Sequence, residues 1–328
     1  MITTTAAAIT TMTAKIEIFA PDIERWRIGN SGIEFLHTFD SGKAGPHVMI
    51  SAVTHGNEIC GAIAVDRLLG MGAGRIRPTR GKLSLVFANV GAFLRFNPAD
   101  PHATRFVDED FNRVWTADAL DGPRDSAELR RARELRPIIN GIDLLLDIHS
   151  MHSPHEPVML CGPLDKGIAF AKRVGMPAHI VSDVGHANGR RLRDYGGFGD
   201  PASEKNALLV ECGQHWDKSA GAVAWQTVWR FLKVTGIMSP AQVGSHIDQA
   251  PSPAQQVIQV TDAIIATTAD FKFAEGLQGL SVLSNKGDLI AIDDKDEVRA
   301  PYDNCVLIMP TLVDVKPGFT AVRLGRVR

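Results

Sequence analysis

The chain has 328 residues, 45% of them hydrophobic and 22% charged, and its formal net charge is −2. These values are ordinary for a globular protein and exclude a disordered or fibrous chain. A net charge near zero without a basic cluster also argues against nucleic acid and anionic membrane surfaces as partners.

The N-terminus and the cysteines are typical of a cytoplasmic protein. Residues 1–14 lack the basic start and apolar core of a secretory signal, and no run of about 18 apolar residues occurs. We expect a loose tail over these residues. The four cysteines lie far apart and form no CxxC pair. This pattern predicts buried, reduced thiols rather than a disulfide framework or a cysteine zinc site.

The first two thirds of the chain alternate strand-like and helix-like segments. Unbroken apolar runs, typical of strands covered on both faces, predict strands at His47–Val53, Leu83–Ala88, Leu144–Ile148, Val158–Cys161 and Ala207–Val210. Helical spacing predicts helices at Asn57–Leu69, Ser126–Arg136, Lys166–Val174 and Ser219–Val234. For the second helix, Asp125 or Ser126 is the expected N-cap and Pro137 the expected end. The alternation predicts an α/β fold with a mixed, mostly parallel sheet flanked by helices.

The long segment Arg95–Trp115 has no clean period. It contains two prolines and many charged residues. Long connections without their own secondary structure are usually functional or disordered, and the charged and aromatic content favours a functional loop.

The last part of the chain has a different residue pattern. Short β-rich pieces are separated by turn residues, at Phe271–Phe273, Leu280–Leu283, Leu289–Ile292, Cys305–Met309 and Thr320–Leu324. This pattern predicts a small all-β domain. We therefore divide the chain into a catalytic domain over 1–240 and a C-terminal β domain over 241–328.

Side chains suited to metal binding follow the ends of separate predicted strands. His55 and Glu58 follow the first strand, His149 follows Leu144–Ile148, and Glu211 follows the last strand. Ligands of open α/β sheets bind at the carboxyl ends of strands. Two imidazoles and one carboxylate make a zinc site with an open position. The sequence therefore predicts one zinc ion held by His55, Glu58 and His149.

Glu211 is the predicted general base. A carboxylate beside the metal can take a proton from the attacking water and return it to the leaving nitrogen. An arginine directed at the developing oxyanion would add electrostatic stabilisation.

Four motifs carry a resemblance to a known family. In chain order they are HGNE (55–58), NPADPHATRFVDEDFNR (97–113), DIHS (147–150) and VECGQH (210–215). Together they resemble the succinylglutamate desuccinylase/aspartoacylase family, a branch of the zinc carboxypeptidase fold. The resemblance covers most of 45–235 and implies the same zinc ligands and the same base.

The resemblance also implies roles for the long loop. Arg105 would polarise the scissile carbonyl, and Asp110 would orient His55. Asn112 and Arg113 would bind a substrate carboxylate, which suits the guanidinium fork.

The chain departs from aspartoacylase at the substrate end. Pro201 stands where aspartoacylase has a further substrate-binding arginine shortly before the base. A different recognition loop is expected instead, with the candidates Arg190, Arg191, Arg193 and Tyr195.

These residues predict a zinc-dependent amidohydrolase that cleaves the amide bond of a small N-acyl amino acid or N-acyl diamine. The sequence is compatible with a homo-oligomer as well as with a monomer. One alternative is a metallocarboxypeptidase acting on peptides, which would need an open groove that a C-terminal domain should narrow. The other is a metal-binding protein without turnover, against which the presence of Glu211 and Arg105 argues.

Overall fold

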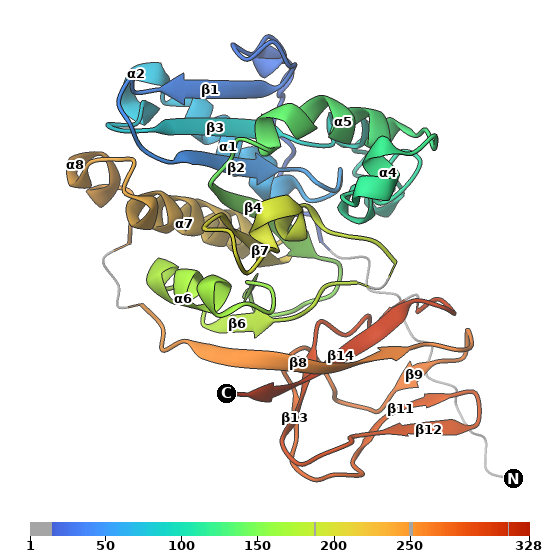
Figure 1. Cartoon of the computed structure of the whole chain (residues 1–328). Helices are drawn as coiled ribbons and strands as arrows, with labels where there is room; N and C mark the ends of the chain where they lie inside the picture. The colour runs from blue at the N-terminus through green and yellow to red at the C-terminus, as the bar shows by residue number, and fades with distance from the viewer. Residues whose placement is uncertain (1–14, 187, 249–251, 314) are drawn as a thin grey trace, which may run out of the picture.

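The computed structural model describes residues 15–186, 188–248, 252–313 and 315–328. The predicted tail over 1–14 lies outside these residues. Within them, an 11-stranded sheet has the order β1-β3-β2-β4-β7-β5-β6-β8-β14-β13-β10 (Figure 1). Its first seven strands are β1 (Leu36–Asp40), β2 (His47–Ala52), β3 (Lys82–Phe87), β4 (Leu144–Met151), β5 (Val158–Leu160), β6 (His179–Ser182) and β7 (Asn206–Gln214).

The centre of this sheet is parallel. β2 pairs in parallel with β3 and with β4, and β4 pairs in parallel with β7. β1 runs antiparallel at one edge, and β5 runs antiparallel to β7. The predicted mixed, mostly parallel sheet is therefore confirmed. β1 and β6 were not predicted, because β1 is a half-buried edge strand and β6 is only four residues long.

The four predicted helices are present as α1 (Ile59–Gly70), α5 (Ala127–Ile139), α6 (Asp165–Val174) and α7 (Lys218–Thr235). Shorter helices are α2 (Ala73–Ile76), α3 (Val90–Phe93), α4 (Ala117–Asp121) and α8 (Pro240–Gly244), with 3-10 turns at Glu24–Trp26, Pro101–Thr104, Phe111–Arg113, Leu192–Asp194 and Gly196–Phe198.

The end of α5 differs from the prediction. Ser126 is its N-cap, and its side chain accepts a hydrogen bond from the backbone of Leu129 at 3.0 Å. Pro137 does not end the helix, which continues to Ile139. Leu135 and Ile139 lie four residues apart in the same core, and their packing holds the last turn around the proline.

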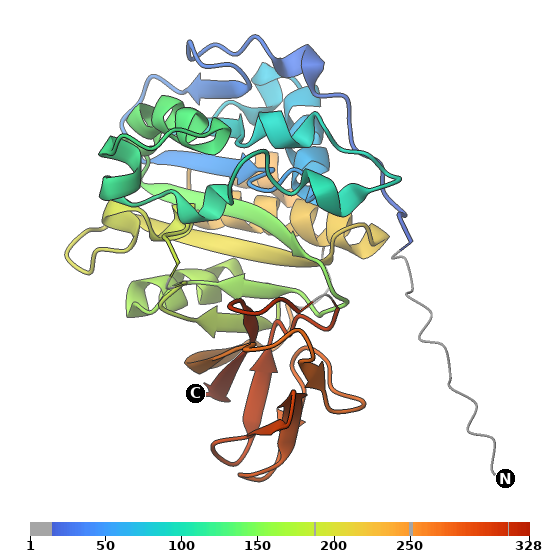
Figure 2. The same ribbon diagram turned by 90° about the vertical axis from the view of Figure 1, so that its right-hand side faces the viewer.

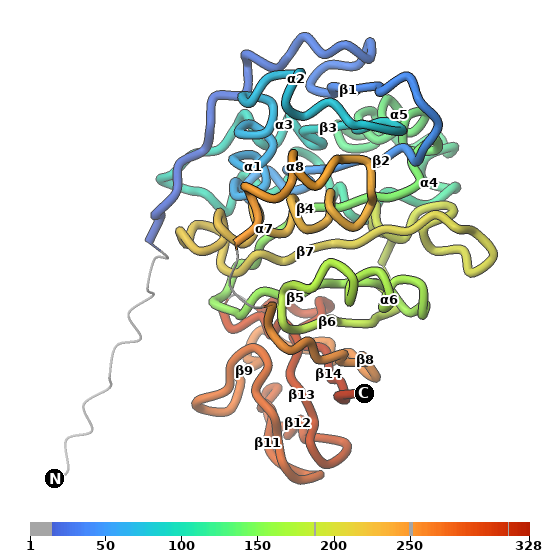
Figure 3. The backbone as a smooth tube through the Cα atoms, turned by 90° about the vertical axis from the view of Figure 1, so that its left-hand side faces the viewer, coloured from blue at the N-terminus to red at the C-terminus, as the bar shows by residue number. Residues whose placement is uncertain are grey.

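Helices cover both faces of the sheet. α1, α6 and α7 pack together on one face, over the larger apolar core (Figure 3). α5 covers the opposite face together with the buried side chains of Phe111, Val114 and Trp115. The long polar segment therefore ends in the core, which fixes the position of the loop that precedes it. In the part of the chain that the structure describes, no helix has both the length and the apolar character needed to cross a membrane.

The C-terminal region is antiparallel and extends the central sheet (Figures 1 and 2). β8 (Gln256–Ile265) pairs in parallel with β6 and antiparallel with β14 (Thr320–Val327). β13 (Cys305–Ile308) and β10 (Val282–Leu283) complete this sheet, and a second sheet contains β12 (Asp296–Arg299), β11 (Leu289–Asp293) and β9 (Lys272–Phe273). β8 and β12 were not predicted, because many of their residues are exposed and polar residues interrupt their apolar positions. The division at residue 240 stays a proposal.

Candidate metal centre

The turn after β2 places two of the predicted ligands. Val53 adopts a left-handed conformation with φ of 55°, which is unusual for a β-branched residue and marks a constrained turn. The backbone N–H of Glu58 then donates to the carbonyl of His55 at 3.2 Å. Gly56 lies so close to the long loop that a Cβ atom would be 2.3 Å from the carbonyl oxygen of Thr104. This close approach brings Arg105 to the turn.

The side chains of His55, Glu58 and His149 converge. One ligand atom from each lies within 4.8 Å of the others, and all three side chains are buried. Glu58 lies between the imidazoles: its Oε1 is 2.6 Å from Nδ1 of His55, and its Oε2 is 2.8 Å from Nδ1 of His149. Two nitrogen donors and a carboxylate at such distances suit a tetrahedral zinc site with an open position. The residues therefore fit the predicted metal.

A second carboxylate orients each imidazole. Oδ1 of Asp110 is 3.0 Å from Nε2 of His55, and Oδ2 of Asp147 is 2.9 Å from Nε2 of His149. Thr54 donates to the other oxygen of Asp147 at 2.9 Å. Such contacts fix the ring orientation of metal ligands and raise their basicity. Asp147 was missed from the sequence, although its spacing of two from His149 on one strand places both on the same face.

The electrostatics of the cluster follow from burial and close charges. Burial acts to raise the pKa of Glu58, but the imidazoles of His55 and His149 outweigh it and hold that pKa well below its usual value. Burial acts to lower the pKa of His149, but the carboxylates of Asp147 and Glu58 outweigh it and raise that pKa well above its usual value. The cluster is therefore a group of buried, closely spaced ionisable side chains with perturbed pKa values, as functional sites often are.

Glu211 lies beside the cluster on the neighbouring strand. It is in register with His149 across the parallel pair β4 and β7. Its side chain is buried, and Oε2 has no hydrogen-bond partner among the described residues. Burial, reinforced by the charges of Glu58 and Asp147, raises the pKa of Glu211 to about 8, although His149 and Arg105 oppose this effect. A buried carboxyl group with a free oxygen is suited to hold and transfer a proton.

Arg105 approaches the cluster from the long loop. Its Nη2 is 2.9 Å from Nε2 of His55 and 3.3 Å from Oδ2 of Asp110, and its Nη1 is 3.5 Å from Oε1 of Glu58. The side chain is 37% exposed, so it borders both solvent and the buried ligands. A guanidinium in this place can donate hydrogen bonds to a group that enters the site.

Asn112 and Arg113 differ in how much of each side chain stays available. Oδ1 of Asn112 accepts a hydrogen bond from the backbone of Leu192 at 2.9 Å, so this oxygen joins two loops. Arg113 donates to the carbonyl of Asn112 at 2.9 Å, and its nearest carboxylate contact is with Asp110 at 4.0 Å. Burial lowers the pKa of Arg113 to about 10, although Asp110 opposes it. Of the two predicted substrate-binding residues, Arg113 has the freer side chain.

Two arginines of the expected recognition loop are buried and donate their hydrogen bonds to groups within the protein. Arg191 donates to both carboxylate oxygens of Asp183, at 3.0 and 2.7 Å, and to Asp194 at 2.6 Å. Arg193 donates to the carbonyls of Cys161 and Ala207, at 2.8 Å each. Both side chains are buried. The interpretation of Arg191 and Arg193 as recognition residues is therefore wrong.

Sequence reasoning missed a buried glutamate that holds the long loop. Glu128, at the start of α5, accepts hydrogen bonds from the backbone of Val107 at 2.7 Å, Asp108 at 3.0 Å and Glu109 at 3.2 Å. It also accepts one from the side chain of Asn89 at 3.1 Å. These bonds fix the segment between Arg105 and Asp110. A glutamate in a first helical turn carries no local signal for such a role.

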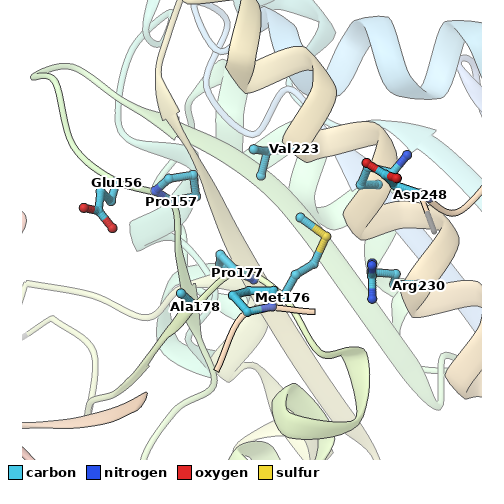
Figure 4. A pocket seen from close by; sticks show the side chains of 10 residues that line it. Glu156, Pro157, Met176, Pro177, Ala178, Val223, Arg230 and Asp248 are labelled. Atoms are coloured by element: carbon cyan, nitrogen blue, oxygen red, sulfur yellow. Dashed lines mark hydrogen bonds between the residues drawn. The ribbon is translucent and has the colours of Figure 1, made fainter. Parts of the chain in front are cut away.

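A surface hollow lies away from this cluster. It has a volume of about 290 Å³, and its lining includes Met176, Pro177, Val223 and Arg230 (Figure 4). None of the predicted site residues lines it. The chemistry therefore has to be sought at the strand ends rather than at this hollow.

Comparison with known proteins agrees with this arrangement. The chain resembles the crystal structure of a succinylglutamate desuccinylase from Silicibacter sp. TM1040 with a TM-score of 0.63 and a sequence identity of 19%. The superposition covers 89% of this chain and 88% of that chain. The product-bound ectoine utilization protein EutE (DoeB) from Ruegeria pomeroyi is 18% identical, covers 89% of each chain and has a TM-score of 0.61. These likenesses define the class: an aspartoacylase/carboxypeptidase-like α/β fold.

The sequence comparison adds the family. The model of the succinylglutamate desuccinylase/aspartoacylase catalytic domain matches residues 44–222. A succinylglutamate desuccinylase from Pseudoalteromonas atlantica is 25% identical over 308 residues, which cover 85% of this chain and 80% of that protein. The chain belongs to the succinylglutamate desuccinylase/aspartoacylase family, a family of deacylases.

Proposed function

We propose that the protein is a zinc-dependent deacylase that hydrolyses the amide bond of a small N-acyl amino acid or N-acyl diamine. The observation that carries this proposal is the buried Glu211, whose unpartnered Oε2 lies on the strand next to the two imidazoles and Glu58. The family of the chain supports the reaction class. We further propose one zinc ion per chain, on His55, Glu58 and His149, and a cytoplasmic location.

The bound metal would supply Lewis acidity, which activates water and polarises the substrate carbonyl. The residues of the chain account for the other steps. Glu211 takes a proton from the attacking water and returns it to the leaving nitrogen as the carbon–nitrogen bond breaks. Arg105 donates hydrogen bonds to the carbonyl oxygen as negative charge develops there.

The surrounding residues position these groups. Asp110 and Asp147 hold the imidazoles so that each Nδ1 faces Glu58. Arg113, with its remote contact to Asp110, binds a substrate carboxylate, and Asn112 fixes the loop beside it. Burial of the two imidazoles, Glu58 and Glu211 lowers the local dielectric and strengthens the electrostatic interactions among them.

A substrate screen with a base variant tests the proposal. Zinc-loaded protein should hydrolyse at least one member of a panel of N-acyl amino acids and N-acetyl diamines. Glu211→Gln should retain its zinc and lose most turnover, while the exposed Glu204→Gln should behave as wild type. Full turnover by Glu211→Gln would remove Glu211 as the base. Absence of hydrolysis across the panel, or a preference for long peptides, would contradict the proposal that the protein is a deacylase.

A further inference from the structure

Arg323 is a buried arginine in the C-terminal region. It lies in β14, paired with Ala263 of β8 on one side and Ile308 of β13 on the other, and its residue is 9% exposed. Val322 and Leu324, its neighbours in sequence, pack in the apolar core of the C-terminal region. The Arg323 side chain projects to the opposite face and meets His186 from the catalytic part of the chain.

The turn around His186 connects Arg323 to the predicted substrate-binding segment. Nη2 of Arg323 lies 2.7 Å from Nδ1 and 3.0 Å from Nε2 of His186. His186 forms a β-bridge with Gly189. Gly189 packs directly on Arg113, since a Cβ atom there would lie 2.3 Å from the carbonyl oxygen and 2.9 Å from the Cβ of Arg113. The two arginines thus border the same turn, one from each part of the chain.

Among the described residues, Arg323 has no carboxylate in ion-pair contact with its guanidinium. None of their carboxylate oxygens lies within 4.0 Å of its guanidinium, whereas Asp183 and Asp194 are already bonded to Arg191. His186 offers Arg323 one accepting ring nitrogen but no negative charge, because burial and the charges of Arg323 and Arg113 lower its pKa to about 2 and keep the ring neutral.

Buried guanidinium groups normally have an anionic partner, because an unpaired charge away from water is unfavourable. Burial lowers the pKa of Arg323 although the charges of Asp183 and Glu211 oppose it. An anion from outside the chain that binds between Arg323 and Arg113 would neutralise these positive charges.

We propose that Arg323 is a specificity-determining residue that binds a substrate carboxylate remote from the scissile amide. The inference rests on the proposed function. The substrate is then an N-acyl amino acid with a second carboxylate, in its side chain or in its acyl group. The planar fork of the guanidinium suits this group, and His186 holds the fork in place. The C-terminal region thereby takes part in substrate selection.

Acid and amide pairs of substrates test Arg323. The pairs are N-acetyl-aspartate with N-acetyl-asparagine, N-acetyl-glutamate with N-acetyl-glutamine, and N-succinyl-alanine with N-succinamyl-alanine. In at least one pair, zinc-loaded wild type should prefer the acid. Arg323→Gln should lower kcat/KM for that acid by roughly 10- to 100-fold and for its amide by less than about threefold. The control Arg326→Gln removes an exposed arginine of the same strand and should keep the preference.

A binding measurement separates this inference from the proposed function. Calorimetry should show that zinc-loaded wild type binds succinate more tightly than its monoamide, succinamate, and that Arg323→Gln loses this difference with unchanged zinc content. Hydrolysis of no substrate would overturn the proposed function, but the succinate comparison would still decide the role of Arg323.

Several results would overturn the role of Arg323. They are equal wild-type binding of succinate and succinamate, an unchanged preference in Arg323→Gln, or an equal loss of preference in Arg326→Gln. If Arg323→Gln does not fold, Arg323→Lys replaces it. The lysine keeps the charge but loses the fork, and it should reduce the preference for the acid without abolishing it.

Discussion

Asp147 and His149 lie two residues apart on β4, and Oδ2 of the aspartate is 2.9 Å from Nε2 of the imidazole. Asp147 itself is fully buried and is held by Thr54. The same strand therefore supplies both a predicted metal ligand and the carboxylate that orients it. This pairing converts a ring with two possible orientations into one that presents Nδ1 to Glu58.

Asp147→Asn should weaken zinc binding by roughly 10- to 100-fold, because the amide cannot polarise the imidazole as a carboxylate does. Thr54→Val, which removes only the hydrogen bond to Asp147, should have a smaller effect in the same direction. Competition with a chromogenic chelator measures both affinities. The exposed Asp165→Asn is the control and should match wild type. Unchanged zinc affinity in Asp147→Asn would show that this contact does not orient a ligand.

Zinc should stabilise the folded chain. A ligand that binds only the native state at a free concentration of 100 times its Kd contributes about 2.7 kcal/mol, which corresponds to a rise in Tm of roughly 5 °C for a protein of this size. Differential scanning calorimetry after removal and return of zinc measures the rise. His149→Gln removes one of the converging ligands and should abolish it. An equal rise in Tm in that variant would show that zinc binds at a site without His149.

Glu128→Gln should impair catalysis without removing the metal. The buried carboxylate accepts from three successive backbone N–H groups, and an amide cannot satisfy all of them. We expect a loss of about 1–3 kcal/mol in the free energy of unfolding and a clear fall in kcat/KM, because the loop that carries Arg105 becomes less fixed. Glu134→Gln, on the exposed face of the same helix, is the matched control. Equal effects of the two substitutions would contradict the prediction.

Asp183 should contribute pH-dependent stability through Arg191. Burial acts to raise the pKa of Asp183, but the guanidinium outweighs it and lowers that pKa to about 2. Because the folded pKa lies below the unfolded value of about 4, the contribution is complete above pH 4 and is lost as the pH falls toward 2. It amounts to about 2 kcal/mol.

Urea unfolding of wild type and Asp183→Asn measures this contribution. The difference in the free energy of unfolding should be constant between about pH 5 and 7 and should shrink between about pH 4 and 2. A difference that stays the same across the acid range would mean that the pair does not depress the pKa of Asp183.

Much of the fold was predictable because its signals are local. The apolar runs that form β2, β3, β4, β5 and β7 lie in the sheet, and Ser126 caps α5. β8 was missed because most of its residues are at least partly exposed and polar residues interrupt its apolar positions. Pro137 misled the prediction of the end of α5, since packing of Ile139 outweighs the cost of proline in a last turn.

The pattern of apolar runs and polar residues along the chain was enough to predict which side chains follow the ends of the parallel strands. It placed His55, Glu58, His149 and Glu211 at one edge of the sheet. Two contacts became visible only in the folded chain: Glu128 holds the long loop, and Arg323 meets His186, which is 137 residues away in the sequence. A strand end leaves a short-range pattern of apolar and polar residues, whereas a buried charge takes its partner from whatever segment the folded chain brings beside it, and no spacing in the sequence records that choice.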